Sequence, residues 1–455
     1  MMIARFMVLV TVAAGVTAVA PPASARPAPI DWRPCAADKD AQCADLTLPV
    51  DWSEPSGATF TLAVARRAAP ESTRIGTLIF GPGGPGDSGV RRVVTGQSRF
   101  SDELRSRFDI VSFDPRGVGG SNPIKCPTKV PAPAVLKDQA EFDATRKANR
   151  EFWDACRVLT GPVFDHADTG STVRDLDALR AALGERSLTF HGSSYGTLLG
   201  ELYAERYPGR VRAMVLESVV DHSQDTRGFL TTQAWALQDS FDAFVAWCDT
   251  TEACVLHGED VRSIWAQQMA RADDGTLGVS AFELAANAHD ALRKPNYPAL
   301  ATFIDGLRDG GTASPASQRP VQAVFCADWS LPVRNYREYQ RLLRAAAAEA
   351  PDVRLPAATF GLSDCLGWPK PVASPQHVLH VRTRTPLLLI NARHDPATGY
   401  NWATEVARQL GRHGVLLTYA GAGHGSYGST CMRSAVDAYL ISAALPAPGT
   451  VCPAA

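Results

Sequence analysis

The chain has 455 residues, of which 45% are hydrophobic and 20% are charged, so it carries enough apolar side chains for a sizeable core. Its 45 lysines and arginines nearly balance 47 aspartates and glutamates, which gives a formal net charge of −2. This balance gives no indication of binding to nucleic acid or to a membrane surface, which an excess of basic residues would suggest.

The N-terminus has the pattern of a secretory signal peptide. Arg5 precedes an apolar run over 6–20, and the small residues at 23–25 form a cleavage site. The run is short for a membrane-spanning helix, and two prolines follow it. We therefore expect residues 1–25 to be removed after Ala25, leaving a secreted chain without a stable membrane anchor.

Short apolar runs then alternate with helical stretches, a pattern typical of a mostly parallel sheet covered by helices. Strands are expected at 75–80, 108–113, 187–191, 211–220, 386–391 and 415–419, and helices at 175–183 and 195–207. Between about 222 and 380 the alternation stops and helical stretches dominate. The sequence thus predicts an α/β core formed by 26–221 and 381–455, with a helical lid inserted at 222–380.

The chain has ten cysteines, an even number spread in sequence-local pairs, which suits an oxidising compartment. Pairing of neighbours predicts the disulfides Cys35–Cys43, Cys126–Cys156, Cys248–Cys254, Cys326–Cys365 and Cys431–Cys452, although sequence alone does not determine connectivity. No metal site is expected, because the cysteine spacings fit no zinc pattern and His377 and His380 lack a nearby acidic ligand.

One pentapeptide, GSSYG at 192–196, matches the pattern G-x-S-x-G. It lies between an expected strand and an expected helix, which is the setting of a nucleophile elbow with Ser194 at the tip. The serine oxygen would stand above the sheet at a helix N-terminus, where amides and dipole favour negative charge. The alternative is a tight turn that merely uses small residues.

A serine nucleophile needs a base and an acid that orients the base. Asp395 follows the expected strand at 386–391, and His424 follows the strand at 415–419, so both reach the sheet edge of Ser194. The alternative for Asp395 is a cap or Asx turn, and for His424 a surface histidine. His394 cannot be the base as well, since it adjoins Asp395.

The oxyanion of the intermediate needs two backbone N–H donors. We expect one from Tyr195, which follows the nucleophile, and one from Gly84 in the glycine-rich loop at 81–86. That loop lacks the lysine of a phosphate-binding loop, so a nucleotide cofactor is not expected.

Four segments together resemble the prolyl iminopeptidases and the actinobacterial tripeptidyl aminopeptidases. They are GTLIFGPGGPGDSG at 76–89, FDPRGVGGSN at 113–122, HGSSYGT at 191–197 and AGHGSYG at 422–428. The resemblance implies an α/β-hydrolase fold and a serine peptidase that releases short N-terminal pieces from peptide substrates. Asp87 stands where that group often has glycine, and its carboxylate would disfavour an oxyanion or alter substrate preference.

Two other functions stay open at this point. The first is a secreted carboxylester hydrolase, because the same triad hydrolyses esters. The second is a non-catalytic binding protein, which should have lost a triad residue, whereas this chain has all three. A peptidase that recognises a free N-terminus needs a carboxylate for the ammonium group. Glu217, near the end of the expected strand at 211–220, and Asp328, in the expected lid, are the candidates.

Overall fold

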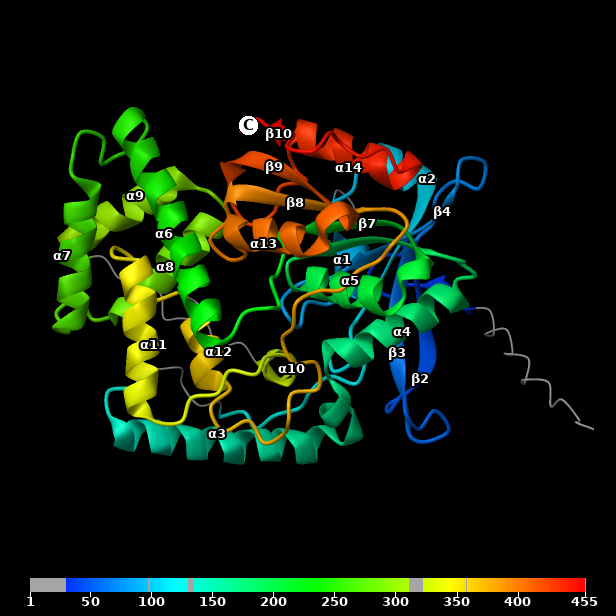
Figure 1. Ribbon diagram of the computed structural model, residues 1–455, viewed down its shortest axis with the longest axis horizontal. Helices are drawn as coiled ribbons and strands as arrows, with labels where there is room; N and C mark the ends of the chain where they lie inside the picture. The colour runs from blue at the N-terminus through cyan, green and yellow to red at the C-terminus, as the bar shows by residue number, and fades with distance from the viewer. Residues whose placement is uncertain (1–29, 97–98, 130–134, 311–321, 357, 455) are drawn as a thin grey trace, which may run out of the picture.

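The computed structural model describes residues 30–96, 99–129, 135–310, 322–356 and 358–454 (Figure 1). The expected signal peptide lies outside these residues. The strands are β1 (Arg33–Pro34), β2 (Gln42–Pro49), β3 (Thr59–Arg67), β4 (Gly76–Gly81), β5 (Phe108–Phe113), β6 (Leu188–Ser193), β7 (Val211–Glu217), β8 (Leu387–His394), β9 (Gly414–Ala422) and β10 (Val451–Cys452).

The helices alternate with these strands, except between β7 and β8, where the described residues form a run of consecutive helices. They are α1 (Gly89–Thr95), α2 (Asp102–Arg107), α3 (Gln139–Thr160), α4 (Thr169–Ala182), α5 (Tyr195–Arg206), α6 (Thr226–Thr250), α7 (Val261–Asp273), α8 (Ala281–Arg293), α9 (Tyr297–Gly306), α10 (Gln322–Asp328), α11 (Tyr336–Glu349), α12 (Ala358–Asp364), α13 (Tyr400–Leu410) and α14 (Thr430–Ser442).

The described strands form one sheet in the order β1-β2-β3-β5-β4-β6-β7-β8-β9-β10. From β5 to β10 neighbouring strands are parallel, whereas β1, β2 and β3 add antiparallel pairs at one edge. The six strands expected from the sequence are present as β4 to β9, and β5 has the expected bounds. The α/β class with a mostly parallel sheet is therefore confirmed.

The central strands are apolar because helices cover both faces of the sheet. On one face Leu78 and Ile110 pack in a cluster with Met432 and Tyr439 of α14 (Figure 1). On the other face the side chains that alternate with these, such as Ile79 and Val111, pack with residues of α4, α5 and α13. The parallel pairing of these strands, together with burial on both faces, holds the loops at the strand ends in place.

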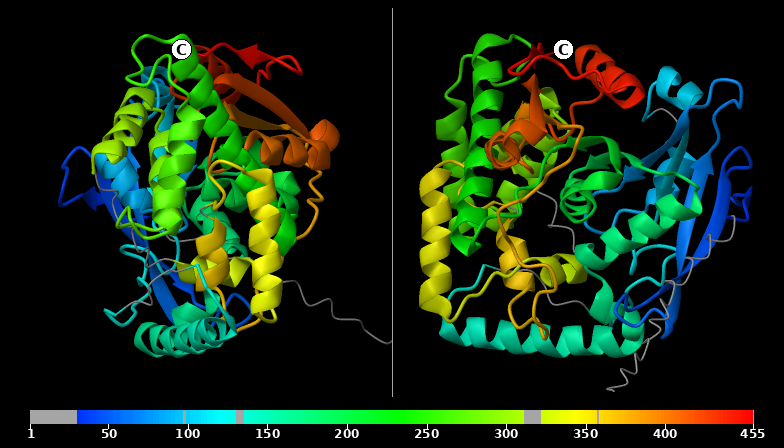
Figure 2. Two further views of the ribbon diagram at one scale, coloured as in Figure 1. Left: turned by 90° about the vertical axis from the view of Figure 1, so that its left-hand side faces the viewer. Right: turned by 45° about the vertical axis from the view of Figure 1, so that its right-hand side comes forward.

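The helices α6 to α12 all lie between β7 and β8 in the sequence, and we call them the helical insert. Figures 1 and 2 show them gathered beside the sheet, with the long helix α3 running along one end of the group. Asn149 and Trp153 of α3 donate hydrogen bonds to the carbonyls of Ser363 and Asp364, at 2.7 and 3.0 Å. The helical side of the molecule therefore includes a helix that precedes β6 in the chain.

All five predicted disulfides are present: Cys35–Cys43, Cys126–Cys156, Cys248–Cys254, Cys326–Cys365 and Cys431–Cys452. Two of them lie within the helical insert, and the last joins α14 to β10. Within the described ranges, no helix combines the length and the apolar character that crossing a membrane requires.

Candidate active site

Ser194 occupies the sharp turn between β6 and α5. Its φ and ψ are 56° and −124°, a conformation that residues other than glycine rarely adopt. The turn is held on both sides: the Ser194 N–H donates to the Glu217 carbonyl at 2.8 Å, and the Ser194 carbonyl accepts the Thr197 N–H at 2.8 Å. The strained conformation is thus maintained by the neighbouring strand β7 and by the first turn of α5.

The two glycines of the pentapeptide are required because other backbone segments pass very close to them. A Cβ atom on Gly196 would lie 2.3 Å from the Gly81 carbonyl oxygen, and one on Gly192 would lie 2.4 Å from the Gly196 carbonyl oxygen. Both distances are too short for any side chain, and both involve backbone that cannot move aside. Glycine at these positions lets β6, α5 and the loop after β4 meet beneath the serine.

Asp395 and His424 lie directly after β8 and in the loop after β9, as the sequence predicts. The Nδ1 atom of His424 is 3.0 Å from each carboxylate oxygen of Asp395. Asp395 also accepts the N–H groups of Ala397 and Thr398, at 2.9 and 3.0 Å. Asp395 therefore both forms an Asx turn with its own loop and contacts His424. His394 points elsewhere and pairs with Asp239 at 2.9 Å.

The environment of Asp395 favours its ionised form. Complete burial opposes ionisation, but the charge and hydrogen bond of His424, together with the two amides, outweigh this effect and lower the pKa of Asp395. The carboxylate can therefore keep a proton on Nδ1 of His424, which leaves Nε2 free to act as a base.

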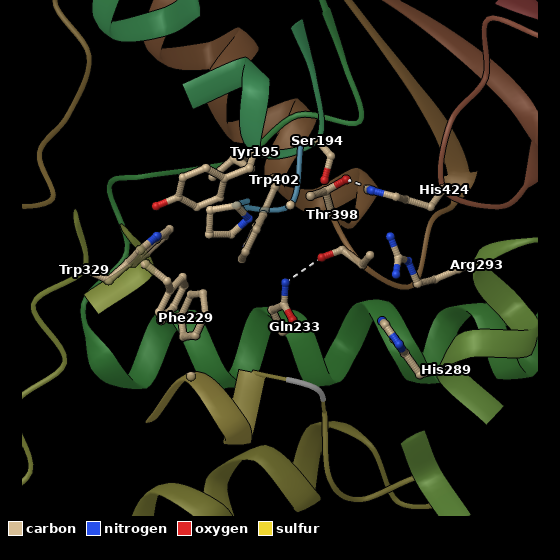
Figure 3. Close-up of a pocket in the computed structure, with 16 residues that line it drawn as sticks. Ser194, Tyr195, Phe229, Gln233, His289, Arg293, Trp329, Thr398, Trp402 and His424 are labelled. Carbon is tan, nitrogen blue, oxygen red and sulfur yellow. Dashed lines mark hydrogen bonds between the residues drawn. The ribbon is translucent and has the colours of Figure 1, made fainter. Parts of the chain in front are cut away.

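Ser194 and His424 line the same pocket (Figure 3). One part of the pocket wall is aromatic and another is basic, and the insert supplies residues to both. The described lining residues are Gly84, Pro85, Ser194, Tyr195, Val220, Phe229, Gln233, His289, Arg293, Phe325, Trp329, Gly361, Ala397, Thr398, Trp402 and His424.

Gly84 and Tyr195, the expected oxyanion donors, both line this pocket. The loop comes so close that a Cβ atom on Gly83 would lie 3.0 Å from the Ser194 Cβ. Asp87 does not line the pocket and instead pairs with Arg92 at 2.7 Å. Its negative charge is balanced on the outer side of the loop.

Glu217 does not line the pocket; it is buried against the loop that carries His424. One carboxylate oxygen accepts the N–H groups of Ser426 and Tyr427 at 2.9 Å each. The other lies 2.8 Å from Arg99 Nη2 and 3.0 Å from His191 Nε2. Burial opposes ionisation, but the charge of Arg99 and these hydrogen bonds outweigh it and hold the pKa of Glu217 well below its usual value.

Asp328 is also buried behind the pocket wall, next to Trp329 in the sequence. Its carboxylate accepts the N–H and the hydroxyl of Thr169 at 2.8 and 2.6 Å, and the Tyr195 hydroxyl at 2.6 Å. Burial and the nearby charge of Asp168 raise the pKa of Asp328 to about 7. Neither acid chosen from the sequence therefore faces the pocket.

Most of the pocket lining was not predicted from the sequence, including His289 and Arg293 of α8. Their spacing of four places them on one face of the helix, but no motif marks that face as part of a site. The end of α8 also contacts the loop of His424, because the backbone N–H of His424 donates to the Arg293 carbonyl at 2.8 Å.

The chain is similar to several known proteins. The family model described as "TAP-like protein" matches residues 356–452. The tripeptidyl aminopeptidase of Streptomyces coelicolor is 33% identical over 473 residues, covering 94% of this chain and 87% of the relative. The serine protease Hip1 of Mycobacterium tuberculosis is 30% identical, covering 93% of this chain and 91% of the relative. Carboxylesterase B of the same organism is 29% identical, covering 91% of this chain and 86% of the relative. The chain thus belongs to the tripeptidyl aminopeptidase-like family of serine hydrolases with the α/β-hydrolase fold.

Proposed function

We propose that this chain is a secreted serine exopeptidase that releases short peptides from the N-termini of its substrates. The observation that carries the proposal is the strained Ser194 in one pocket with His424, whose imidazole is held by the ionised Asp395. The relatives named tripeptidyl aminopeptidase and serine protease support a peptide substrate.

In the proposed reaction, His424 Nε2 takes the proton of the Ser194 hydroxyl as its oxygen attacks the scissile carbonyl carbon. The N–H groups of Gly84 and Tyr195 bind the resulting oxyanion. When the intermediate collapses, His424 gives the proton to the departing amine, which leaves an ester on Ser194. A water molecule, deprotonated by His424, then hydrolyses that ester and restores the serine.

Secretion is proposed from two features that agree. Residues 1–25 have the composition of a signal peptide, and all ten cysteines are paired in disulfides. Such a set of disulfides persists in an oxidising compartment outside the cytoplasm.

A carboxylester hydrolase is the second candidate, and the lining of the pocket favours it. Among the described lining residues there is no carboxylate, so a substrate ammonium group would find no anionic partner in them. An ester substrate needs only an apolar pocket for its acyl group, which the aromatic residues of this lining supply. The relative named carboxylesterase B points to the same chemistry.

Both candidates share the nucleophile and differ in substrate, so one set of assays separates them. We expect a fluorophosphonate probe to label the wild-type protein and the Ser193→Ala control, but not Ser194→Ala. The exopeptidase should cleave peptides with a free N-terminus much faster than the same peptides with an acetylated N-terminus. Equal cleavage of both forms contradicts the exopeptidase, and hydrolysis of esters alone identifies the esterase. Labelling of Ser194→Ala at full stoichiometry contradicts both.

A further inference from the structure

The basic part of the pocket wall has no role in the reaction proposed above. It consists of Arg293 and His289, which stand one helical turn apart on α8. Figure 3 shows both side chains extending toward the pocket, with the Arg293 guanidinium near His424 and the aromatic residues Phe229 and Trp329 on the other side. The pocket therefore has an aromatic end and a basic end, with Ser194 between the two and His424 on the basic side.

No carboxylate lies among the described lining residues of the pocket, and Arg293 brings a positive charge to it. Apart from Tyr195, whose hydroxyl is bound to Asp328, the ionisable residues of the described lining are His289, Arg293 and His424. Arg293 is half-buried, and a guanidinium in such a place is stabilised most by an anion that meets its planar fork with two parallel hydrogen bonds. A substrate carboxylate has this geometry.

His289 provides a second, independent sign of a ligand. Its side chain is buried, with a relative exposure of 6%, and its Nε2 atom has no hydrogen-bond partner among the described residues. Buried polar atoms in proteins are normally hydrogen-bonded, so an unpartnered one in a pocket wall indicates a group that a ligand completes. Nδ1 lies 3.6 Å from Asp290, too far to fix the tautomer, and Nε2 can therefore carry the donated hydrogen.

The position of Arg293 relative to His424 identifies the part of the substrate that it meets. His424 delivers its proton to the departing group, so that group lies on the side of His424. The backbone carbonyl of Arg293 accepts a hydrogen bond from the backbone N–H of His424 at 2.8 Å, and this keeps α8 beside the base. The aromatic end is then left for the part of the substrate that is transferred to Ser194.

We propose that Arg293 and His289 form a subsite for a carboxylate in the departing part of the substrate. The inference rests on the proposed peptidase function and narrows its substrates to peptides with a carboxylate close to the bond that is cut. Two groups have this chemistry: the C-terminal carboxylate of a single departing residue, and the side chain of aspartate or glutamate directly after the cut.

Four peptides with the same N-terminal tripeptide distinguish these sources. The tripeptide is followed by glycine with a free carboxylate, glycine amide, glutamate amide or glutamine amide. If the C-terminal carboxylate binds, kcat/KM for glycine exceeds that for glycine amide by about tenfold or more, a factor equal to about 1.4 kcal/mol. If the side chain binds, the glutamate amide peptide exceeds the glutamine amide peptide by a similar factor.

The variants test whether α8 is responsible for that preference. In Arg293→Gln the ratio of kcat/KM between the charged peptide and its amide counterpart should fall to about one. Arg293→Lys should keep part of this preference because the positive charge remains. Arg341→Gln is the matched control, since Arg341 is exposed on α11 and does not line the pocket, so its ratio should equal that of the wild type.

The ratios in the wild-type protein test the subsite even if a variant does not fold. Ratios of one in both peptide pairs overturn the inference, as does a preference that persists in Arg293→Gln. These results leave the peptidase function intact, because the peptides are still cleaved. Failure to cleave any of the four peptides contradicts the peptidase function itself, and the subsite with it.

Discussion

Among single residues, Glu217 is the one whose contacts join Ser194 to the loop of His424, and no sequence motif indicates this role. Its backbone carbonyl holds the Ser194 N–H, and its side chain holds the loop of His424 through the amides of Ser426 and Tyr427. Arg99 supplies the balancing charge at 2.8 Å. Glu217 is therefore placed to position Ser194 and His424 relative to each other without lining the pocket.

Replacing Glu217 by glutamine should lower kcat for peptides and for small esters alike, with little change in KM. The amide removes the charge that pairs with Arg99. Because the Arg99 side chain is 29% exposed, the loss of unfolding free energy should stay below the roughly 3–5 kcal/mol of a fully buried pair. Kinetics on both substrates, with denaturant unfolding, measure these effects, and Glu349→Gln, at an exposed residue of α11, is the control. Loss of peptide turnover with full ester turnover would instead support the original role as an amine anchor.

Gly196 allows a second test at the level of one atom. In Gly196→Ala the new Cβ would meet the Gly81 carbonyl, so the turn must distort, and we expect kcat to fall by at least about tenfold, as for other misplaced catalytic groups. Gly306→Ala on α9 is the control because its Cβ would meet nothing within 4 Å, and alanine should stabilise that helix by about 0.5–1 kcal/mol. Unchanged kcat in Gly196→Ala would show that the elbow tolerates a side chain.

At the scale of elements, Asp328 links α10 of the insert to the core through Thr169 and Tyr195. Its pKa is about 7 in the folded protein and near 3.8 in an unfolded chain. Between these values the folded state holds a proton that the unfolded state has lost, so this residue makes the protein less stable as the pH rises from about 4 to 7.

Asp328→Asn should remove this dependence. The unfolding free energy of the variant should rise relative to the wild type by about 1.4 kcal/mol for each pH unit between 4 and 7. Denaturant unfolding at several pH values measures the difference in unfolding free energy between the variant and the wild type. The contributions of groups that titrate in both proteins cancel in this difference. Asp143→Asn, at an exposed residue of α3, should show no such trend. A constant difference for Asp328→Asn across this range would contradict the expectation.

The same elements show why part of the structure could be predicted and part could not. The parallel strands β4 to β8 are apolar runs buried on both faces, and this makes them visible in the sequence. β2 alternates buried and exposed residues and includes polar side chains, so it was not predicted. In α3 only Phe142, Asn149, Trp153 and Cys156 are buried over 22 residues, which leaves a weak pattern.

The candidate site divides in the same way. Asp395 and His424 could be chosen because they follow strands, and the ends of parallel strands meet at one edge of a sheet. Arg293 and His289 reach the pocket through the packing of α8 within the insert, which no local pattern encodes. Glu217 was chosen for its position near the end of a strand, but the sequence could not show that Arg99, more than a hundred residues earlier, pairs with it.

For the molecule as a whole, the disulfides add stability that the core does not supply. Cys431–Cys452 closes a segment of 21 residues and holds the last strand against the sheet. Replacing both cysteines by alanine should lower the unfolding free energy by about 3 kcal/mol, because the unfolded chain gains freedom. Denaturant unfolding under oxidising conditions measures this loss. An unchanged midpoint would mean that the C-terminal segment contributes nothing to global stability.

The pairing of β7 with β8 has a consequence for biogenesis. Val215 of β7 pairs with Leu388 of β8, which lies 173 positions later in the chain. A polypeptide that emerges with its N-terminus first therefore presents the open edge of β7 until the whole insert has followed. An open strand edge is a template for pairing with other chains, and contacts so distant in sequence form slowly. Nascent chains that end before β8 should accordingly be the species most prone to aggregate, and the ones that most need a chaperone.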